Sequence, residues 1–425
     1  MSSEENVLHL FEGYGIELEY MIVDKDSLRV LPIADKLIYD EVGAYVSDVE
    51  FGQIAWSNEL VQHVVELKTQ MPAPSLNGLA QQFQEHVQKI NEMLAKYNAM
   101  LLPTGAHPFM DPFTETVLWQ HEYSAVYEAY NQIFDCRGHG WSNLQSTHIN
   151  LPFANDGEFA RLHAAIRLVL PLIPALSASS PVMDGKLTGL LDTRIEVYRH
   201  NQDKIPSIAG KVIPEPVYTR QQYEEQILQR IYADVAPYDP QAVLQEEFIN
   251  SRGAIARFSR NAIEIRLIDI QECPLADMAI AHAITGVVKA LVAEKWQTHD
   301  HIKNIDTQVL ADLLLQVIRT GQDTMIQHEQ FLSSFGLSTT ASCTAGELWQ
   351  HLVAETSAAE EQQELAEALQ TILVKGNLAT RIVEALGAAP AHETIIKVYK
   401  TVATCLQSGV LFKPDNTYAK NFTDM

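Results

Sequence analysis

The amino-acid sequence predicts an α+β fold in which a sheet-forming part precedes a long helical region. Three observations support this prediction. Short runs rich in Ile, Val, Tyr and Leu alternate with turn residues over positions 13–69, which is typical of strands. Residues 261–271 form the most strand-like segment of the chain. From about residue 306 to residue 408, apolar residues recur at helical spacing.

The elements between these segments follow from periodicity and from chain breakers. Residues 75–100 predict the first helix, with Ser75 as candidate N-cap after a Pro-Ala-Pro sequence. Short strands are expected to begin at residues 101–102 and at residues 146–152. Residues 158–178 predict a long apolar helix that two internal prolines kink. Further helices are expected at about residues 221–235 and 275–296.

Composition limits the classes of partner. The chain has 425 residues, 47% of them hydrophobic, so it can bury a substantial core. Its formal net charge of −24 and the lack of a basic patch exclude general nucleic-acid binding. The most apolar stretch, residues 168–176, is too short to span a bilayer, and the acidic N-terminus is unlike a signal peptide. Because the four cysteines form no CxxC pair, we expect a protein of the reducing cytoplasm without a membrane partner.

Two glutamates alternate with apolar residues in the first strand-like run. If residues 15–23 form a strand, Glu17 and Glu19 share one face and Ile16, Leu18 and Tyr20 the other. A half-buried strand with a solvated outer face would give the same alternation. However, Met21 and Val23 continue on the glutamate face, where two carboxylates repel each other unless a cation neutralises them.

A second acidic pair and a histidine come from two other predicted strands. Glu66 lies in an apolar run, where an acid is costly without a partner. Glu59 precedes it by seven positions, so the two converge only if a bulge or turn separates them. His148 and Asn150 share a face of the strand at residues 146–152, either as structural residues or as ligands.

The strand at residues 261–271 carries an acid and a base on one face. Alternation places Glu264 and Arg266 together, with Ile268 and Ile270 on the same side. This pattern fits either an ion pair within a sheet or a site that gathers acids for metals and an arginine for phosphate. Carboxylates favour Mg²⁺ or Mn²⁺, which bridge phosphate oxygens. Since the chain has no Walker motif and no dinucleotide fingerprint, phosphoryl-transfer chemistry is expected on the sheet itself.

Five short motifs occur along the chain in an order that suggests a family. They are Gly-Ile-Glu-Leu-Glu at 15–19, Gly-Ala-His-Pro-Phe at 105–109, Thr-His-Ile-Asn at 147–150, Ala-Leu-Ser-Ala-Ser-Ser-Pro at 175–181 and Ile-Glu-Ile-Arg-Leu-Ile-Asp at 263–269. Together they resemble the glutamate–cysteine ligase type 2 family of carboxylate–amine ligases, which is related to glutamine synthetase. The motifs do not extend into the helical carboxy-terminal region.

The resemblance implies a fold and a set of functional residues. It implies a curved antiparallel sheet that forms an active-site funnel with helices outside, in a catalytic glutamine synthetase-like domain at residues 1–300. Residues 301–425 are expected to form a helical region packed on that domain. The metal ligands that it implies are Glu17, Glu19, Glu59, Glu66, His148 and Glu264. The implied catalytic residues are Glu264 and Arg266. The candidates for binding ATP are Arg194, Arg257 and Arg260. Arg194 could alternatively clamp a substrate carboxylate or belong to a structural ion pair.

The resemblance also implies an activity. We expect a ligase that uses ATP and Mg²⁺, or Mn²⁺, to form an acyl phosphate on an amino-acid carboxylate, which an amine then attacks. Glutamate is the expected acid and cysteine the leading amine, as in glutathione biosynthesis, and a homo-oligomer is compatible with this interpretation. Two alternatives remain open: a phosphotransferase related to guanidino kinases, and a catalytically degenerate homologue that only binds nucleotide or metal.

Overall fold

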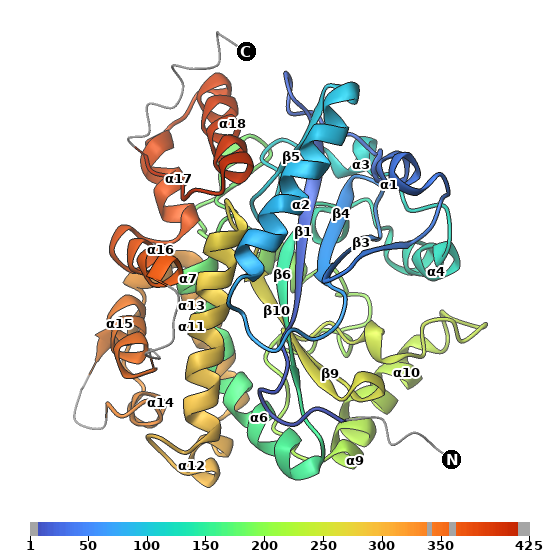
Figure 1. Cartoon of the computed structure of the whole chain (residues 1–425). Coiled ribbons are helices and arrows are strands. Elements are labelled where there is room, and N and C mark those ends of the chain that lie inside the picture. The colour runs from blue at the N-terminus through green and yellow to red at the C-terminus, as the bar shows by residue number, and fades with distance from the viewer. Residues whose placement is uncertain (1–6, 338–341, 357–362, 415–425) are drawn as a thin grey trace.

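An eight-stranded antiparallel sheet crosses the centre of the molecule in the computed structural model (Figure 1). The structure describes residues 7–337, 342–356 and 363–414. The strand order is β2-β3-β4-β1-β6-β10-β9, and β5 also pairs with β1. The strands are β1 (Gly15–Asp24), β2 (Asp48–Phe51), β3 (Ile54–Asn58), β4 (Val64–Thr69), β5 (Ala99–Leu102), β6 (Ser146–Pro152), β9 (Ala254–Arg257) and β10 (Ala262–Asp269).

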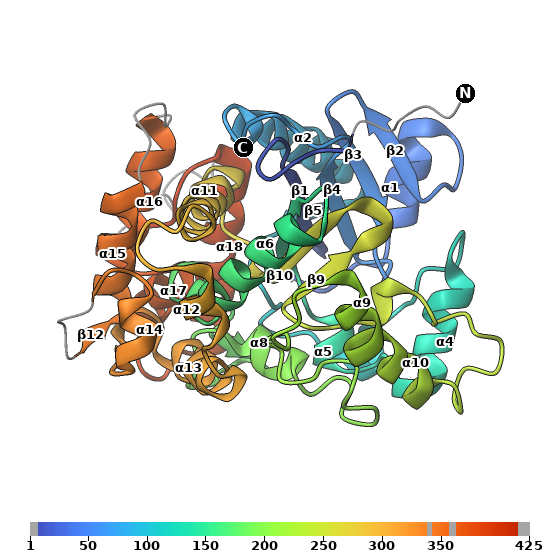
Figure 2. The same ribbon diagram turned by 90° about the horizontal axis from the view of Figure 1, so that it is seen from below.

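The apolar face of this sheet is covered by three helices. Ile16, Leu18 and Tyr20 of β1 are fully buried in the main hydrophobic core, as their alternation predicted. The helices α2 (Leu79–Leu94), α6 (Asp156–Val169) and α11 (Pro274–Val292) contribute to the same core. On the opposite side of the sheet lie α4 (Ser124–Phe134), α5 (His139–Ser142) and α8 (Thr193–Tyr198) (Figure 2). The sheet therefore has one face buried under helices and one face available for a site.

Several predicted helices are present with shifted or broken boundaries. The helix expected over residues 75–100 is shorter, with Gly78 rather than Ser75 as N-cap. The helix expected over residues 221–235 comprises α9 (Arg220–Tyr223), a π-helical turn (Glu224–Leu228) and α10 (Gln229–Val235). A helix missing from the prediction, α1 (Ala34–Val42), lies within the stretch assigned to strands. Its buried residues Ala34, Leu37 and Ile38 have helical spacing, but the run is too short for a clear periodic signal.

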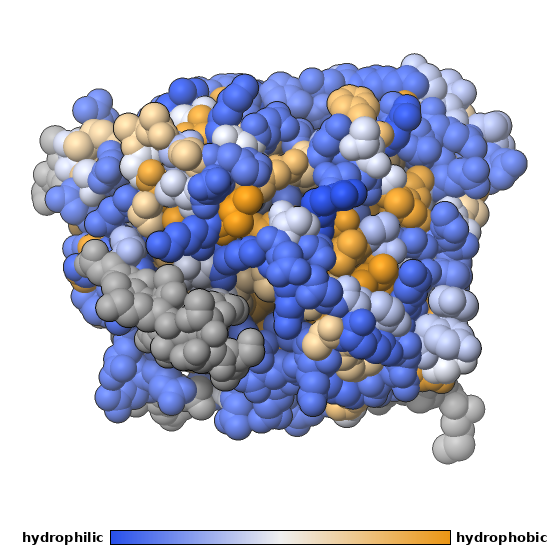
Figure 3. All heavy atoms as spheres, turned by 90° about the horizontal axis from the view of Figure 1, so that it is seen from above, coloured by the Kyte–Doolittle hydropathy of each residue, from blue (hydrophilic) through white to orange (hydrophobic). Residues whose placement is uncertain are grey.

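The predicted kink after α6 is confirmed, and it interrupts a long apolar segment. A 3₁₀ turn (Leu170–Leu172) separates α6 from α7 (Ile173–Ser177). The sequence predicts that its most apolar stretch, residues 168–176, is too short to span a bilayer. The whole helical run Asp156–Ser177 is nevertheless long and apolar enough to cross a membrane, and so is Pro274–Val292. Within the fold, 89% and 72% of their apolar windows are buried. Burial in the core thus accounts for their hydrophobicity. In Figure 3, the face seen from above is mostly hydrophilic, with small scattered apolar patches.

The carboxy-terminal region is mostly helical, as predicted. Its helices are α12 (His299–Lys303), α13 (Thr307–Thr320), α14 (Glu329–Ser333), α15 (Ala345–Thr356), α16 (Gln363–Lys375), α17 (Leu378–Leu386) and α18 (His392–Ser408). A two-stranded sheet of β11 (Met325–Ile326) and β12 (Cys343–Thr344) corrects the all-helical expectation, because strands of two residues leave no periodic signal. Helices α15 and α16 contact α11, and α18 contacts β5. The domain boundary at residue 300 stays a prediction.

A β-bulge changes which residues of β10 face the core. The register against β6 shifts between Ile265 and Ile268. Because a bulge inserts an extra residue into one strand, the alternation of faces is interrupted there. Ile268 and Ile270 consequently join the hydrophobic core instead of sharing the face of Glu264 and Arg266, so their predicted placement was wrong. The remaining elements are α3 (Pro112–Glu115) and the two-stranded sheet of β7 (Val182–Met183) and β8 (Lys186–Leu187). Short 3₁₀ turns lie at Ala95–Tyr97, Glu247–Ile249, Phe258–Arg260 and Gly321–Asp323.

A buried acid beneath the sheet leads to a prediction for stability against pH. Burial raises the pKa of Asp277 on α11 to about 8, although Thr147 and Gln271 donate hydrogen bonds to its Oδ1. In the unfolded chain the same carboxyl titrates near 3.8. Between these values the folded protein holds a proton that the unfolded chain has lost. The free energy of unfolding should therefore fall as pH rises, by at most about 1.4 kcal/mol per pH unit, and level off above the folded pKa.

We expect Asp277→Asn to flatten this dependence. The amide keeps one oxygen for both donors and removes the ionisable group. Thermal unfolding between about pH 5 and pH 8 should show a smaller loss of Tm with rising pH in Asp277→Asn than in the wild type. Glu92→Gln, on the exposed side of α2, serves as the control and should follow the wild type. Equal slopes for the wild type and Asp277→Asn would show that Asp277 does not hold this proton.

Candidate active site

A cavity of about 960 Å³ opens on the polar face of the central sheet. Strands β1, β3, β4, β6, β9 and β10 form its floor, and residues of α4, α5 and α8 form its walls. All ten site residues predicted from the sequence line this cavity: Glu17, Glu19, Glu59, Glu66, His148, Arg194, Arg257, Arg260, Glu264 and Arg266. Residues that are far apart in the chain thus line the same cavity. The funnel shape and curvature implied by the resemblance, and the individual roles of these residues, stay predictions.

The register of the strands sets the arrangement of the acidic residues. Glu17 on β1 lies opposite Lys68 on β4 and opposite His148 on β6. Glu19 on β1 lies opposite Glu66 on β4. Because directly opposed residues of antiparallel strands have close Cβ atoms, these side chains meet above the same part of the sheet. The arrangement follows from pairing of β1 with two different strands, which alternation within β1 alone does not reveal.

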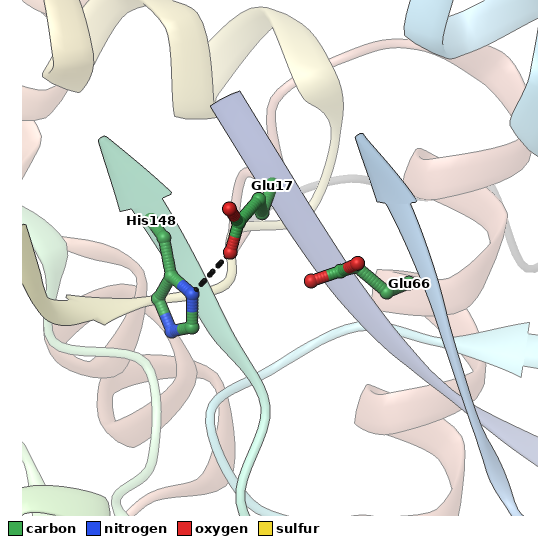
Figure 4. A group of neighbouring side chains, drawn as sticks. All are labelled: Glu17, Glu66 and His148. Atoms are coloured by element: carbon green, nitrogen blue, oxygen red, sulfur yellow. Dashed lines mark hydrogen bonds and ion pairs between the residues drawn. The ribbon is translucent and has the colours of Figure 1, made fainter. Parts of the chain in front are cut away.

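Three of these side chains lie close enough together to share a metal ion. Glu17, Glu66 and His148 each offer one ligand atom, and the three atoms lie within 4.8 Å of one another (Figure 4). His148 Nδ1 is 2.7 Å from Glu17 Oε2. Two carboxylates are oxygen ligands of the kind that Mg²⁺ and Mn²⁺ take, and imidazole is a common ligand for transition metals. The donor set therefore fits a divalent ion, and Mn²⁺ accommodates all three donors.

The crowding of negative charge around this group shifts the pKa values of Glu66, Glu59 and His148. Burial, with Glu17 and Glu19 adding to it, raises the pKa of Glu66 to about 7 against the opposing effects of Lys68 and Ser57. Burial and the neighbouring glutamates also raise the pKa of Glu59 well above its ordinary value. The pKa of His148 is raised: burial alone would lower it, but the hydrogen bond to Glu17 and the nearby carboxylates outweigh that effect. A bound divalent cation would relieve this repulsion.

Glu59 and Glu66 converge through a turn, as the sequence required. Strand β3 ends at Asn58 and β4 begins at Val64, so Glu59 lies at the start of the hairpin loop. Ser57 pairs with Glu66 across the hairpin and donates a short hydrogen bond to its Oε2. Glu19 is held separately, because its Oε2 accepts hydrogen bonds from the backbone N–H and the hydroxyl of Ser146 at 2.7 and 3.0 Å.

The other end of the site carries arginines. Arg266 Nη2 is 2.6 Å from Glu264 Oε1, and Arg257 Nη1 is 2.9 Å from Glu264 Oε2. The ion pair that the sequence left open as an alternative is therefore present. Although burial alone would raise it, the pKa of Glu264 is lowered by Arg266, His148 and Arg257 together. Because both carboxylate oxygens accept from arginine, a metal ion at Glu264 would share this carboxylate with Arg266 and Arg257.

The two remaining arginines differ in their surroundings. Arg194 on α8 is 2% exposed, forms an ion pair through Nε with Asp269 and donates from Nη2 to the carbonyl of Arg266. This is the structural ion pair that the sequence left as an alternative for Arg194. Arg260 ends a 3₁₀ turn (Phe258–Arg260) and lies exposed at the cavity. Of the two, Arg260 is the arginine that a nucleotide could reach without breaking a buried contact.

Sequence reasoning missed several residues of the cavity. Lys68 lies on the same face of β4 as Glu66, and its Nζ is 3.3 Å from Glu66 Oε2 and 2.6 Å from Asp48 Oδ1. Alternation along β4 is a signal that could have found it. Asn150, which the sequence did place on the same strand face as His148, donates from Nδ2 to Glu17 Oε1 at 3.0 Å and so orients that carboxylate. Most of an aromatic wall was also missed, because its members lie in segments without motifs; only Trp141 was predicted, as a core or lid aromatic. The wall comprises Tyr123, Tyr127, Tyr130, Trp141, Tyr198 and Phe248.

Comparison with known proteins gives a family and a fold. The family model described as glutamate-cysteine ligase family 2 matches residues 14–401. An uncharacterised protein of Archaeoglobus fulgidus is 33% identical over 309 residues, which make up 73% of this chain and 80% of that protein. A protein of Cronobacter sakazakii named "Putative glutamate--cysteine ligase 2" is 24% identical over 195 residues, and the match spans 45% of this chain and about half, 49%, of that protein.

A solved structure shares the fold over most of the chain. Glutamate–cysteine ligase from Francisella tularensis, in complex with AMP, superposes with a TM-score of 0.56 at 11% identity. The superposition covers 93% of this chain and 89% of that chain. The predicted mixed fold, an antiparallel sheet with many helices, is thereby confirmed.

Proposed function

This chain belongs to glutamate–cysteine ligase family 2, and from that premise we propose that it is an ATP-dependent carboxylate–amine ligase. The observation that carries the proposal is the convergence of Glu17, Glu66 and His148 with the Glu264–Arg266 pair in one cavity. Acids at one end would hold divalent ions, and arginines at the other would bind phosphate oxygens. A structural relative crystallised with AMP supports a nucleotide in this fold.

In the proposed reaction, ATP transfers its γ-phosphoryl group to an amino-acid carboxylate, which leaves ADP and an acyl phosphate. The amine nitrogen then attacks the carbonyl carbon, so that the C–N bond forms, inorganic phosphate leaves and the amine gives up a proton. Glu17, Glu66 and His148 would hold the metal, which supplies neutralisation of the triphosphate charge. Arg266 would direct its planar donors to the phosphoryl oxygens, and Glu264 would keep the Arg266 guanidinium in place. Glutamate and cysteine are the first candidates for the acid and the amine, on the ground of family membership.

A phosphate-release assay tests the proposal. The full-length protein is incubated with ATP and Mg²⁺, each amino acid as acid donor, and a panel of amines that includes cysteine. A ligase releases phosphate only when both an acid and an amine are present, and the amide product appears in stoichiometric amount. A phosphorylated acceptor that accumulates without an amine would instead identify a phosphotransferase. Nucleotide binding without turnover across the whole panel would identify a catalytically degenerate homologue.

We expect Glu264→Gln to lower ATP-dependent phosphate release by about 10²-fold or more, because Arg266 and Arg257 lose the carboxylate that positions them. The assay is run at a temperature where circular dichroism shows the variant to be folded, since two arginines then lack an acidic partner. Glu264→Asp keeps the charge but shortens the side chain, and should retain more activity than Glu264→Gln. Full activity of Glu264→Gln would refute the role given to this residue.

A further inference from the structure

Lys68 places a positive charge beside the candidate metal ligands. It follows Glu66 by two residues on β4, so both side chains face the cavity. The pairing of β1 with β4 sets Lys68 directly opposite Glu17. The Lys68 ammonium is 3.3 Å from Glu66 Oε2 and 2.6 Å from Asp48 Oδ1. An ammonium at this position competes with a divalent ion for the Glu66 carboxylate and repels the ion that Glu17 and His148 would share with it.

The two partners of Lys68 differ in exposure, which decides how firmly each one holds it. The Asp48 side chain is 50% exposed at the edge strand β2, so solvent screens its ion pair with Lys68. The Glu66 side chain is only 9% exposed, and its attraction to Lys68 is screened much less. The lysine stem is flexible and 28% exposed, which leaves room for the ammonium to move along the cavity wall.

Two other acids of the cavity also contact basic side chains. His148 Nδ1 lies beside Glu17, and Arg266 and Arg257 form ion pairs with Glu264. Basic groups of the chain itself thus contact Glu66, Glu17 and Glu264, which are all predicted metal ligands. Of these groups, Lys68 is a compact ammonium on a long flexible side chain. Arg266 donates from both Nε and Nη2 to Glu264, and Arg257 contacts the other oxygen of the same buried carboxylate. Lys68 is therefore the cation that can exchange one anionic partner for another at the smallest cost.

We propose that Lys68 is a built-in counter-cation: it pairs with Glu66 before a ligand binds, weakens the binding of a divalent ion that arrives alone, and moves its ammonium to the phosphate oxygens of a nucleotide that enters the cavity. The part that concerns the nucleotide rests on the proposed function, and the part that concerns the metal does not. Lys68 is thus a positioning residue for the Glu66 carboxylate and a binding residue for the nucleotide.

The proposal predicts effects of opposite sign for one substitution. In Lys68→Met, isothermal titration of MnCl₂ into the full chain without nucleotide should show binding at least about tenfold tighter than in the wild type, because a repelling charge is gone. Titration of ATP in the presence of EDTA should show binding about tenfold weaker, because a phosphate partner is gone. A purely structural role for Lys68 would weaken both or change neither.

Two further variants make the experiment specific. Lys68→Arg keeps the charge and should stay close to the wild type in the manganese titration. Lys36→Met, on the exposed surface of α1, removes a lysine that does not line the cavity and should leave both titrations unchanged. If Lys68→Met fails to fold, Lys68→Gln takes its place, since it is neutral and keeps a donor for Asp48.

Unchanged or weaker manganese binding by a folded neutral variant overturns the proposal. So does unchanged ATP binding in a neutral variant when the wild type binds ATP. If neither the wild type nor any variant binds ATP, the proposed function fails, and the manganese titration alone then decides whether Lys68 restrains Glu66.

Discussion

Replacement of Glu17 by Gln is expected to lower ATP-dependent turnover by about 10³-fold and to abolish measurable manganese binding at the site. Glu17 is the central acid of the cavity: its Oε2 is 2.7 Å from His148 Nδ1 and its Oε1 accepts from Asn150 Nδ2 at 3.0 Å. A neutral amide in this place removes one of the charges that a divalent ion needs. Phosphate release and isothermal titration with MnCl₂ measure the two effects.

The fold should survive this substitution, because the glutamine side chain has the same shape and Asn150 can still donate to its oxygen. Glu50→Gln provides the matched control: Glu50 is an exposed acid on the edge strand β2 and does not line the cavity. This control should retain both turnover and metal affinity. Wild-type manganese affinity in Glu17→Gln would exclude Glu17 from the metal site and would remove the main support for the proposed chemistry.

Replacement of Arg381 by Met is expected to lower the free energy of unfolding by about 3–5 kcal/mol, because it leaves a buried carboxylate without its cation. Arg381 on α17 and Glu272, which follows β10, are 1% and 0% exposed and form an ion pair through Nη1 and Oε1. Arg381 Nη1 also donates to the carbonyl of Phe412 at 2.6 Å. One side chain therefore connects the central sheet, α17 and the segment after α18. Chemical denaturation measures the loss.

A double replacement separates the ion pair from the packing around it. Glu272→Leu together with Arg381→Met removes both charges and should recover a substantial part of the loss, because no unpaired charge then remains buried. The double variant additionally loses the hydrogen bond that the Phe412 N–H donates to Glu272 Oε1, so recovery should be incomplete. If the double variant is less stable than Arg381→Met, burial of an unpaired carboxylate is not what destabilises the single variant.

Local patterns in the sequence predicted the strands that bear the candidate ligands. Alternation along residues 15–23 placed Glu17 and Glu19 opposite Ile16 and Leu18, and the structure confirms both faces. The turn required between Glu59 and Glu66 is also present. These predictions hold because the direction of a side chain on a strand depends only on its position along that strand.

Other features depend on contacts between segments, and the sequence did not reveal them. The bulge in β10 reversed the expected faces of Ile268 and Ile270. The ion pairs of Glu264 with Arg257 and of Arg194 with Asp269 join residues from different elements. The role inferred for Lys68 depends on its neighbours in the fold, since it forms an ion pair with Asp48 of β2 and lies opposite Glu17 of β1.

The amino-acid sequence by itself determined the class of fold, the family and the types of ligand that the sheet offers, since these follow from residue identity and from short-range periodicity. The tertiary structure alone decided that Glu17 and Glu66 lie close enough to share a metal ion, that Arg194 is already paired with Asp269, and that Lys68 pairs with Glu66. The physical reason is that charges act through space: the register of neighbouring strands sets the distances between them, and these distances set protonation, ion pairing and affinity for metal.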